Sequence, residues 1–232
     1  MFATGNKKIM GINTSKLNFS CLPSDTKKAL DFLAGQEWLK DTDWYLAGGT
    51  ALALQTGNRK SVDLDFFTER KNFDNVDLVE NLSLSGSLEI DIDKENTVYV
   101  SLYDAKVSFI AYPFFVPDKE MIKYGSVNIL DKTDIAVMKI IAISQRGRKR
   151  DFFHLYWCAK NVEPLEEIIK KLKKQYPSVA HDYHHILKSM VYFDDAESDP
   201  EPVIFFKADW NEIKSYFQKE IPIIIKRLIN LE

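Results

Sequence analysis

Hydrophobic positions change their spacing near the middle of this 232-residue chain. Before residue 130, short apolar runs and alternating positions are separated by turn residues, which is typical of strands. From residue 131 onward, apolar residues recur every three or four positions, which is typical of amphipathic helices. We therefore expect an α/β (α+β) fold with two lobes, a mixed-sheet lobe over residues 1–130 and a helical lobe over residues 131–232.

The first half predicts one helix and then a sheet over residues 44–129. The helix spans 24–40, with Ser24 as its N-cap and Gly35 weakening its end. Its inward residues are Leu30, Leu33, Ala34 and Trp38. The clearest strands are 44–47 and 61–67, and a pair of strands over 97–103 and 106–112 around a turn at 104–105.

The second half predicts five helices, and each ends at a residue or loop that interrupts helical structure. They lie near 132–146, 151–160, 164–175, 179–190 and 209–230. The interruptions are Gly147, Pro164, Pro177 and the polar loop 194–202.

A glycine turn and two aspartates form the most informative pattern in the first half. Residues 45–50 (YLAGGT) predict a strand, a diglycine turn and a short helix capped by Thr50, whose free N–H groups would point at an anion. In residues 61–67 (SVDLDFF), alternation places Val62, Leu64 and Phe66 on one face and Asp63 and Asp65 on the other. An exposed edge strand with solvated aspartates is the alternative.

The paired aspartates predict a divalent cation. Two like charges on one face repel each other, and this repulsion raises one pKa unless a cation lies between them. Mg²⁺ suits this position because it takes oxygen ligands and bridges carboxylates to substrate phosphates.

Positive charge to match a triphosphate comes from the second half. Lys139 and Arg146 are seven residues apart and therefore lie on nearly the same side of a helix. Residues 146–150 (RGRKR) add further cations that suit phosphate oxygens, with a solvated basic loop as the alternative. We expect the apolar residues of the same helix to pack inward, namely Ile135, Met138, Ile141 and Ala142.

Composition narrows the function classes. A content of 45% hydrophobic and 28% charged residues is that of a globular chain, and the net charge of −3 argues against a surface that coats nucleic acid generally. No apolar run is long enough to span a bilayer, and the N-terminus lacks an apolar signal core. We expect a cytoplasmic protein without a membrane partner.

Residues 48–55 (GGTALALQ) and 57–67 (GNRKSVDLDFF) together resemble the signature of the AbiEii-type nucleotidyltransferase toxins, within the DNA polymerase β-like nucleotidyltransferase superfamily. Segments 134–139, 146–156 and 191–197 follow in the order that such proteins show. The resemblance spans roughly residues 25–220.

The resemblance implies a nucleotidyltransferase mixed-sheet lobe with a C-terminal helical lobe that completes the cleft. It implies a metal-dependent enzyme that moves a nucleoside monophosphate from a nucleoside triphosphate to an RNA end, such as tRNA, or to a protein hydroxyl. Mg²⁺ or Mn²⁺ would be the cofactor. The protein would be the toxin of a type IV-like toxin–antitoxin pair, with a winged-helix antitoxin as partner.

Expected site residues follow from the residues and the resemblance together. Asp63 and Asp65 would bind the metal, and Lys139 and Asp151 would complete the catalytic set. The expected nucleotide-binding residues are Gly48, Gly49, Thr50, Arg59, Ser61, Arg146 and Lys149. Asp151 also has a purely structural alternative, since it could cap the helix that follows it.

Two departures from the family pattern leave other functions open. Ser108 stands where a third metal carboxylate is common, and Asn58 stands where His is common. Either the site holds one metal, or it is catalytically weak, or a nearby acid substitutes for the missing carboxylate, namely Glu89, Asp91, Asp93 or Asp104. A nucleotide-binding regulator without catalysis, or an interaction protein on a nucleotidyltransferase scaffold, are the alternatives.

Two other features favour structural roles. His181 and His185 have a metal-compatible spacing but no adjacent Glu, so a zinc site is disfavoured. The acidic segment 194–201 lacks a calcium-loop pattern and is expected to be a solvated connection or a contact for a basic partner.

Overall fold

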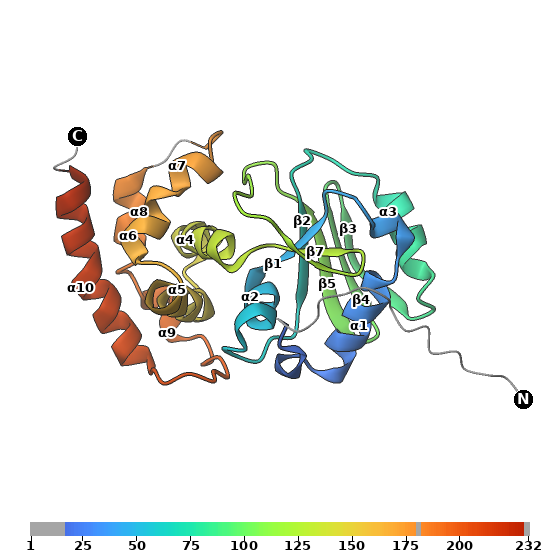
Figure 1. Cartoon of the computed structure of the whole chain (residues 1–232), viewed down its shortest axis with the longest axis horizontal. Helices are drawn as coiled ribbons and strands as arrows, with labels where there is room; N and C mark the ends of the chain where they lie inside the picture. The colour runs from blue at the N-terminus through green and yellow to red at the C-terminus, as the bar shows by residue number, and fades with distance from the viewer. Residues whose placement is uncertain (1–16, 180–181, 230–232) are drawn as a thin grey trace, which may run out of the picture.

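A mixed sheet and a group of helices lie side by side in the computed structural model, which describes residues 17–179 and 182–229 (Figure 1). All strands come from residues 45–129, and the helices that form the other half come from residues 132–229. The α/β class that the sequence predicts is confirmed.

The described residues form a seven-stranded sheet with the order β3-β4-β5-β2-β1-β7-β6. The strands are β1 (Tyr45–Ala47), β2 (Leu64–Thr68), β3 (Leu88–Lys94), β4 (Thr97–Leu102), β5 (Ala105–Ala111), β6 (Ile122–Tyr124) and β7 (Val127–Ile129). Pairs β2–β5 and β1–β7 are parallel, and the other pairs are antiparallel. Strand β2 therefore lies at the centre of the sheet, between β1 and β5.

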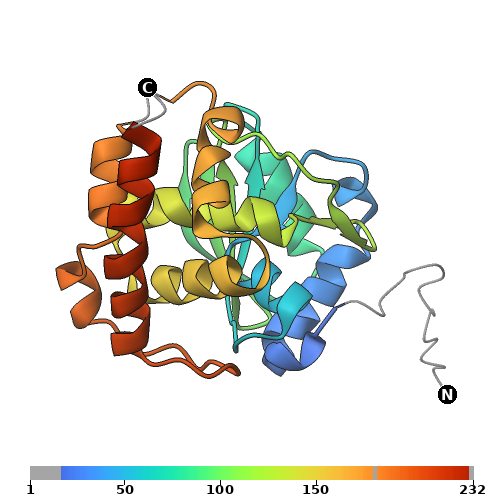
Figure 2. The same cartoon turned by 60° about the vertical axis from the view of Figure 1, so that its left-hand side comes forward.

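Helices occur in both halves of the chain. They are α1 (Ser24–Ala34), α2 (Gly48–Thr56), α3 (Asn75–Ser83), α4 (Lys132–Arg146), α5 (Lys149–Asn161), α6 (Leu165–Lys170), α7 (Leu172–Gln175), α8 (Tyr183–Ser189), α9 (Asp194–Glu197) and α10 (Trp210–Ile229). Two short 3₁₀ turns cover Phe19–Cys21 and Glu37–Leu39. Figure 2 shows α10 along the outside of the helical half, where it contacts α5.

The helix expected over 24–40 is shorter than predicted. It ends at Ala34, and the 3₁₀ turn at Glu37–Leu39 follows after Gly35. Ser24 does not cap it, because Pro23 occupies the N-cap position and the Ser24 hydroxyl lies 3.2 Å from Asp25 Oδ1.

Two other predicted helices have boundaries that differ from the structure. Residues 164–175 form two helices, α6 and α7, that meet at Lys171. Helix α8 begins at Tyr183, where Asp182 caps the N–H of His185. His181 lies outside the described residues, so the histidine pair predicted as structural is not described.

Helix α2 joins the two halves. It contacts β1 and β2 on one side and α4 on the other. Its residues Ala51–Leu54 are fully buried, which fixes α4 opposite the face of β2 and β5. Within the described part of the chain, no helix is both long and apolar enough to cross a membrane.

The chain also returns from the helical half to the sheet half through residues 203–205. The backbone N–H of Phe205 donates to the Asn58 carbonyl at 2.8 Å, and the Lys60 N–H donates to the Val203 carbonyl at 3.0 Å. Between them, Arg59 and Ile204 form an antiparallel bridge. This return segment fixes the loop that holds Arg59.

Candidate active site

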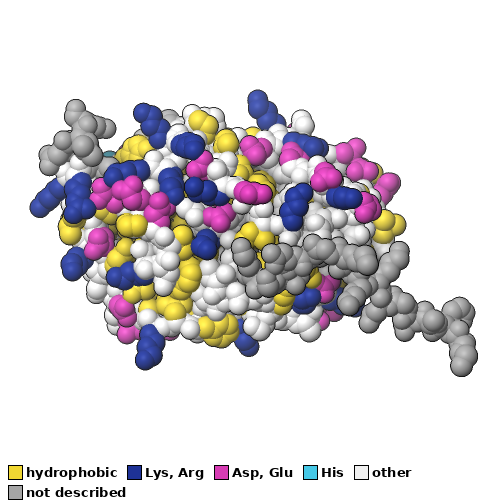
Figure 3. Space-filling view, viewed as in Figure 1, with side chains coloured by type: hydrophobic (Ala, Val, Ile, Leu, Met, Phe, Trp, Pro, Cys, Tyr) yellow, Lys and Arg dark blue, Asp and Glu magenta, His cyan; other side chains and the backbone are white. Residues whose placement is uncertain are grey.

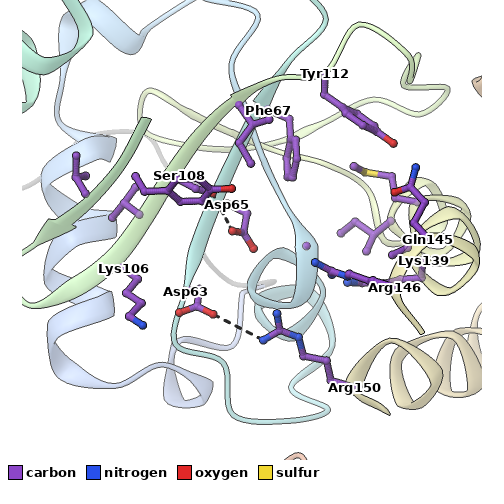
Figure 4. Close-up of a pocket in the computed structure, with 18 of the residues that line it drawn as sticks. Asp63, Asp65, Phe67, Lys106, Ser108, Tyr112, Lys139, Gln145, Arg146 and Arg150 are labelled. Carbon is purple, nitrogen blue, oxygen red and sulfur yellow. Dashed lines mark hydrogen bonds and ion pairs between the residues drawn. The ribbon is translucent and has the colours of Figure 1, made fainter. Parts of the chain in front are cut away.

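A cavity of about 670 Å³ lies between the sheet and helix α4. Strands β2 and β5 line one wall with Asp65, Phe67 and Ser108, and α4 lines the opposite wall with Lys139 and Arg146 (Figure 4). Carboxylates and cations therefore face each other across one space.

Asp65 is placed by the alternation of β2. Its neighbours Leu64 and Phe66 are fully buried on the other face, and Asp65 lies opposite Ala47 of β1 and Ser108 of β5. The Ser108 hydroxyl donates to Asp65 Oδ1 at 2.9 Å. Ser108 thus orients the carboxylate of Asp65, which is expected from the sequence to bind a metal.

Asp63 reaches the same cavity from just before the strand begins. Val62 was expected to be buried with Leu64 and Phe66, but its residue is 52% exposed. The prediction was wrong because β2 starts only at Leu64, so strand alternation does not extend back to Val62.

Glycine is required at the start of α2 by close contacts on both sides. Gly48 has φ +72°, and a Cβ built there would lie 2.8 Å from Asp65 Oδ2. A Cβ at Gly49 would overlap the guanidinium of Arg59. The diglycine therefore lets the first turn of α2 approach both a carboxylate and a partly buried cation.

Thr50 has a different role from the predicted cap. Helix α2 begins at Gly48 with Ala47 as its N-cap, so Thr50 already lies in the first turn. Its hydroxyl lies 2.8 Å from Ser61 Oγ and also contacts the carbonyl oxygen of Asp63. Arg59 donates to the same Ser61 hydroxyl at 3.0 Å. Thr50 and Ser61 thus hold the segment that leads into Asp63.

Lys139 and Arg146 both line the cavity, as their seven-residue spacing predicts. Asp151 of α5 binds both of them: Lys139 Nζ lies 2.6 Å from Oδ1, and Arg146 Nη2 lies 3.1 Å from Oδ2. Burial alone would raise the pKa of Asp151, but these two cations outweigh it and hold that pKa below its usual value. Asp151 is completely buried and lines no part of the cavity, so it holds the two cations in place.

The predicted inward stripe of α4 is confirmed in part, because Ile135 and Ile141 are buried whereas Met138 and Ala142 are partly exposed. Ile135, Met138 and Ala142 line the cavity together with Lys139 and Arg146, whereas Ile141 is buried elsewhere. One helix face therefore presents apolar residues near its start and cations near its end.

The basic segment 146–150 is divided between several partners, because α5 starts at Lys149 and successive side chains point in different directions. Arg150 lines the cavity and lies 3.8 Å from Asp63 Oδ2. Lys149 points away: its ammonium donates to the Asp199 carbonyl at 2.8 Å and to the Glu197 carbonyl at 3.3 Å. Lys149 is expected from the sequence to bind the nucleotide, but its side chain does not reach the cavity.

The acidic segment 194–201 is the partner of these basic residues. Asp199 accepts from the Lys149 backbone N–H at 2.9 Å and pairs with Arg148 at 2.8 Å. Glu197 pairs with Lys214 and accepts from the Trp210 indole at 3.0 Å. The segment is largely exposed, as expected of a solvated connection, and through Asp199 it also anchors the start of α5.

A second, much smaller cavity of about 20 Å³ adjoins the first beside Gly49 and Thr50. Arg59 and His154 line it. Neither ring nitrogen of His154 has a hydrogen-bond partner among the described residues, although His154 is only 1% exposed. Burial, and then the nearby cations Lys139 and Arg59, hold the pKa of His154 well below its ordinary value. Burial likewise lowers the pKa of Arg59 to about 10, which leaves it cationic at neutral pH. His154 is therefore neutral in a cationic surrounding.

A third carboxylate does not complete the pair. Among the described residues, no group of three His, Cys, Asp or Glu side chains is arranged to hold a metal ion. Of the four acids considered from the sequence, Asp91 lines the cavity, where it accepts from Ser101 at 3.3 Å. Asn58, at the other departure from the family pattern, is buried and lines neither cavity.

Several site residues escaped the sequence analysis. Arg150 and His154 lie at i and i+4 at the start of α5, so helical spacing would have placed them on one face. Phe67 and Tyr112 gave no separate signal, because an aromatic residue at a strand position is indistinguishable from a core residue.

Comparisons with known proteins agree with this geometry. The chain matches the family model described as nucleotidyl transferase AbiEii toxin, type IV TA system, over residues 31–93 and 85–223. An uncharacterised protein of Aquifex aeolicus (strain VF5) is 34% identical over 186 residues, which cover 77% of this chain and 86% of that protein.

Two solved structures share the fold. A candidate nucleotidyltransferase from H. pylori superposes with a TM-score of 0.53 at 21% identity, covering 89% of this chain and 96% of that one. MenT4, a nucleotidyltransferase toxin from Mycobacterium tuberculosis H37Rv, gives a TM-score of 0.50 at 15% identity, covering 88% and 86%.

The fold, with its paired aspartates beside a diglycine turn, is that of a nucleotidyltransferase. The chain belongs to the AbiEii nucleotidyltransferase toxin family, because the family model matches most of its length. The family that the sequence resembles is thereby confirmed.

Proposed function

We propose that this protein transfers a nucleoside monophosphate from a nucleoside triphosphate to an RNA end or a protein hydroxyl. The observation that supports this proposal is one cavity in which Asp63 and Asp65 face Lys139, Arg146 and Arg150. The start of α2 at Gly48 borders the same space, so its N–H groups and dipole favour phosphoryl oxygens.

The donor set fits a divalent cation. Mg²⁺ commonly binds through one or two carboxylates, several waters and substrate phosphates, and Asp63 and Asp65 supply two carboxylates that face the cavity. Mg²⁺ or Mn²⁺ at these two residues would activate the acceptor oxygen and neutralise charge on the α-phosphate.

The remaining residues position the triphosphate. Lys139 and Arg146 are held by Asp151 and would bind the β- and γ-phosphates as the α–β bond breaks and pyrophosphate leaves. Gly48, Gly49 and the Thr50 N–H would receive phosphate oxygens at the first turn of α2. Because the Thr50 and Ser61 hydroxyls bind each other, we assign them to holding Asp63 and Arg59 rather than to direct phosphate contact.

The test is label transfer from each α-³²P nucleoside triphosphate to total tRNA and to cell protein, with Mg²⁺. Asp63→Ala should reduce label incorporation by orders of magnitude, and Asp77→Ala, which changes an exposed acid on α3, should not. Unchanged incorporation in the Asp63 variant would refute the proposal.

A nucleotide-binding regulator is the second candidate. The observation that favours it is Ser108, which contacts Asp65 where a third carboxylate is common in the superfamily. Calorimetric titration with triphosphate and Mg²⁺ that gives binding, combined with no label transfer to any acceptor, would select this candidate.

We further propose that the protein acts in the cytoplasm as the toxin of a type IV-like pair whose antitoxin is a winged-helix protein. The family model supports a toxin, and Figure 3 shows acidic and basic side chains interspersed over one face of the molecule. A mixed face of this kind argues for a defined acceptor contact over a general coat for nucleic acid. Co-expression with the protein encoded by the neighbouring gene should restore growth that the wild-type chain arrests.

A further inference from the structure

The cavity changes from charged to aromatic along two parallel strands. On β2, the side chains that face the cavity are Asp65 and then Phe67, and Asp63 precedes them. On β5 and just beyond it, they are Lys106, Ser108, Ile110 and Tyr112. Register pairs Asp65 with Ser108 and Phe67 with Ile110, so both strands change character in the same direction (Figure 4).

Helix α4 changes in the same direction on the opposite wall. Its end carries Arg146, which meets the aspartates' end of the cavity. Its start lies at the aromatic end, because Gln175 donates to Asp134 at 2.7 Å and the next residue, Tyr176, packs on Tyr112. Strands β2 and β5 and helix α4 thus all change from charged residues at one end of the cavity to apolar and aromatic residues at the other.

We define the aromatic end as Phe67, Tyr112 and Tyr176, whose rings pack against one another. Phe67 and Tyr112 pack edge to face with ring centroids 5.8 Å apart, and Tyr112 and Tyr176 do so at 6.3 Å. All three residues line the cavity; Tyr176 is almost completely buried, whereas Phe67 and Tyr112 are only partly buried. The two rings therefore leave aromatic surface facing an open space.

We propose that the aromatic end binds the nucleobase of the triphosphate by stacking. This inference rests on the proposed function and adds a base subsite to it. With phosphates at the charged end, the base must lie within the length of one nucleotide, and Phe67 follows Asp65 after a rise of about 7 Å along β2. Apolar walls with few polar groups are what such ligands require.

Stacking at this end has a consequence for base selectivity. A hydroxyl both donates and accepts, so the Tyr112 hydroxyl, which also donates to the Tyr176 hydroxyl at 3.5 Å, offers no fixed pattern of donors and acceptors to a base edge. Stacking itself tolerates every base because each has a π-face. We therefore expect ATP, GTP, CTP and UTP to bind with Kd values within about tenfold of one another.

The test compares nucleotides with inorganic triphosphate, which lacks a base, by calorimetry on the full chain with Mg²⁺. Tyr112→Leu and Phe67→Leu each remove a ring but keep apolar volume. Each should raise the Kd of every nucleoside triphosphate by roughly 5- to 150-fold and leave the Kd of inorganic triphosphate unchanged. Tyr112→Phe keeps the ring and should bind nucleotides nearly as wild type does.

Tyr192→Leu is the matched control, because Tyr192 is an exposed tyrosine outside both cavities. Equal weakening of nucleotides and inorganic triphosphate in the Leu variants would overturn the base subsite, as would equal affinity for both ligands in the wild-type chain. A preference of more than about a hundredfold for one base would overturn stacking as the mode of recognition. Failure of both ligands to bind the wild-type chain would instead refute the proposed function itself.

Discussion

Gly48 lies directly against Asp65, at a distance that leaves no room for a side chain. A Cβ at residue 48 would lie 2.8 Å from Asp65 Oδ2, and the backbone there has φ +72°. The glycine thus allows helix α2 to start beside the carboxylate. A diglycine after a strand therefore indicates two things in this sequence, a turn and a close approach of the backbone to the Asp65 carboxylate.

Gly48→Ala should lower both stability and activity. The left-handed backbone costs about 1–2 kcal/mol for a residue with a Cβ, and the contact with Asp65 adds to this cost. Gly86→Ala is the matched control, since Gly86 has φ +68° and a Cβ added there would meet no described residue within 4 Å. Urea denaturation of both variants isolates the Asp65 contact as their difference, and equal losses would show that Asp65 is not constrained by Gly48.

Breaking the buried pair of Lys139 and Asp151 should be strongly destabilising. Asp151→Leu alone leaves the buried Lys139 without its partner and should cost about 3–5 kcal/mol. Lys139→Met should cost less, because Arg146 still pairs with Asp151. The double variant should be less destabilised than the sum of the two. Urea denaturation measures this coupling.

The exposed pair of Lys40 and Glu37 supplies the control for that cycle. Its atoms lie 3.4 Å apart with side chains 55% and 85% exposed, so its coupling should be about 1 kcal/mol or less. Additive effects at Lys139 and Asp151 would contradict the assignment of Asp151 as the residue that holds Lys139.

Adding a third carboxylate should make stability depend on metal. Ser108→Asp would place a carboxylate beside Asp65, where the serine hydroxyl now lies at 2.9 Å. Like charges should destabilise the chain in EDTA, and Mn²⁺ at about 100 times its Kd should return about 2.7 kcal/mol. Thermal unfolding with and without Mn²⁺ is the measurement, and Ser108→Asn is the uncharged control. A metal response no larger than that of Ser108→Asn would count against a cation at Asp65.

Acid should destabilise the fold through His154. Its pKa in the folded chain is well below the ordinary value of 6.5, so the unfolded chain takes up the proton first as the pH falls. The contribution of neutral His154 is complete above about pH 6.5 and is lost below it, by up to about 1.4 kcal/mol per pH unit.

His154→Gln should therefore flatten the pH dependence of the unfolding free energy below about pH 6.5, whatever its effect on absolute stability. His184→Gln, which changes an exposed histidine, should keep the wild-type slope. If the unfolding free energy of the His154 variant kept the wild-type dependence on pH, His154 would take up its proton as readily in the folded chain as in the unfolded one.

The sequence predicts the parts of the site that depend on local periodicity. Asp65 faces away from Leu64 and Phe66 because β2 alternates, and Lys139 and Arg146 share a face because α4 is regular. The α/β class and the order of strands before helices follow from the same patterns.

Other features depend on partners far away in the chain. Lys149 leaves the cavity because Glu197 and Asp199 offer it carbonyl groups some fifty residues later. Asp151 pairs with Lys139 because α4 and α5 pack together, and no local sequence pattern predicts that packing. The missing signal in each case is tertiary contact, since propensity and spacing describe only neighbours along the chain.

The backbone bonds between residues 203–205 and 58–60 make the Arg59 loop depend on a late part of the polypeptide. During synthesis, both aspartates and the diglycine leave the ribosome well before the return segment at residues 203–205 does. A nascent chain that ends before Val203 thus carries the acids but lacks the hydrogen bonds that fix Arg59 beside them. The complete site can therefore form only after residues 203–205 have been synthesised.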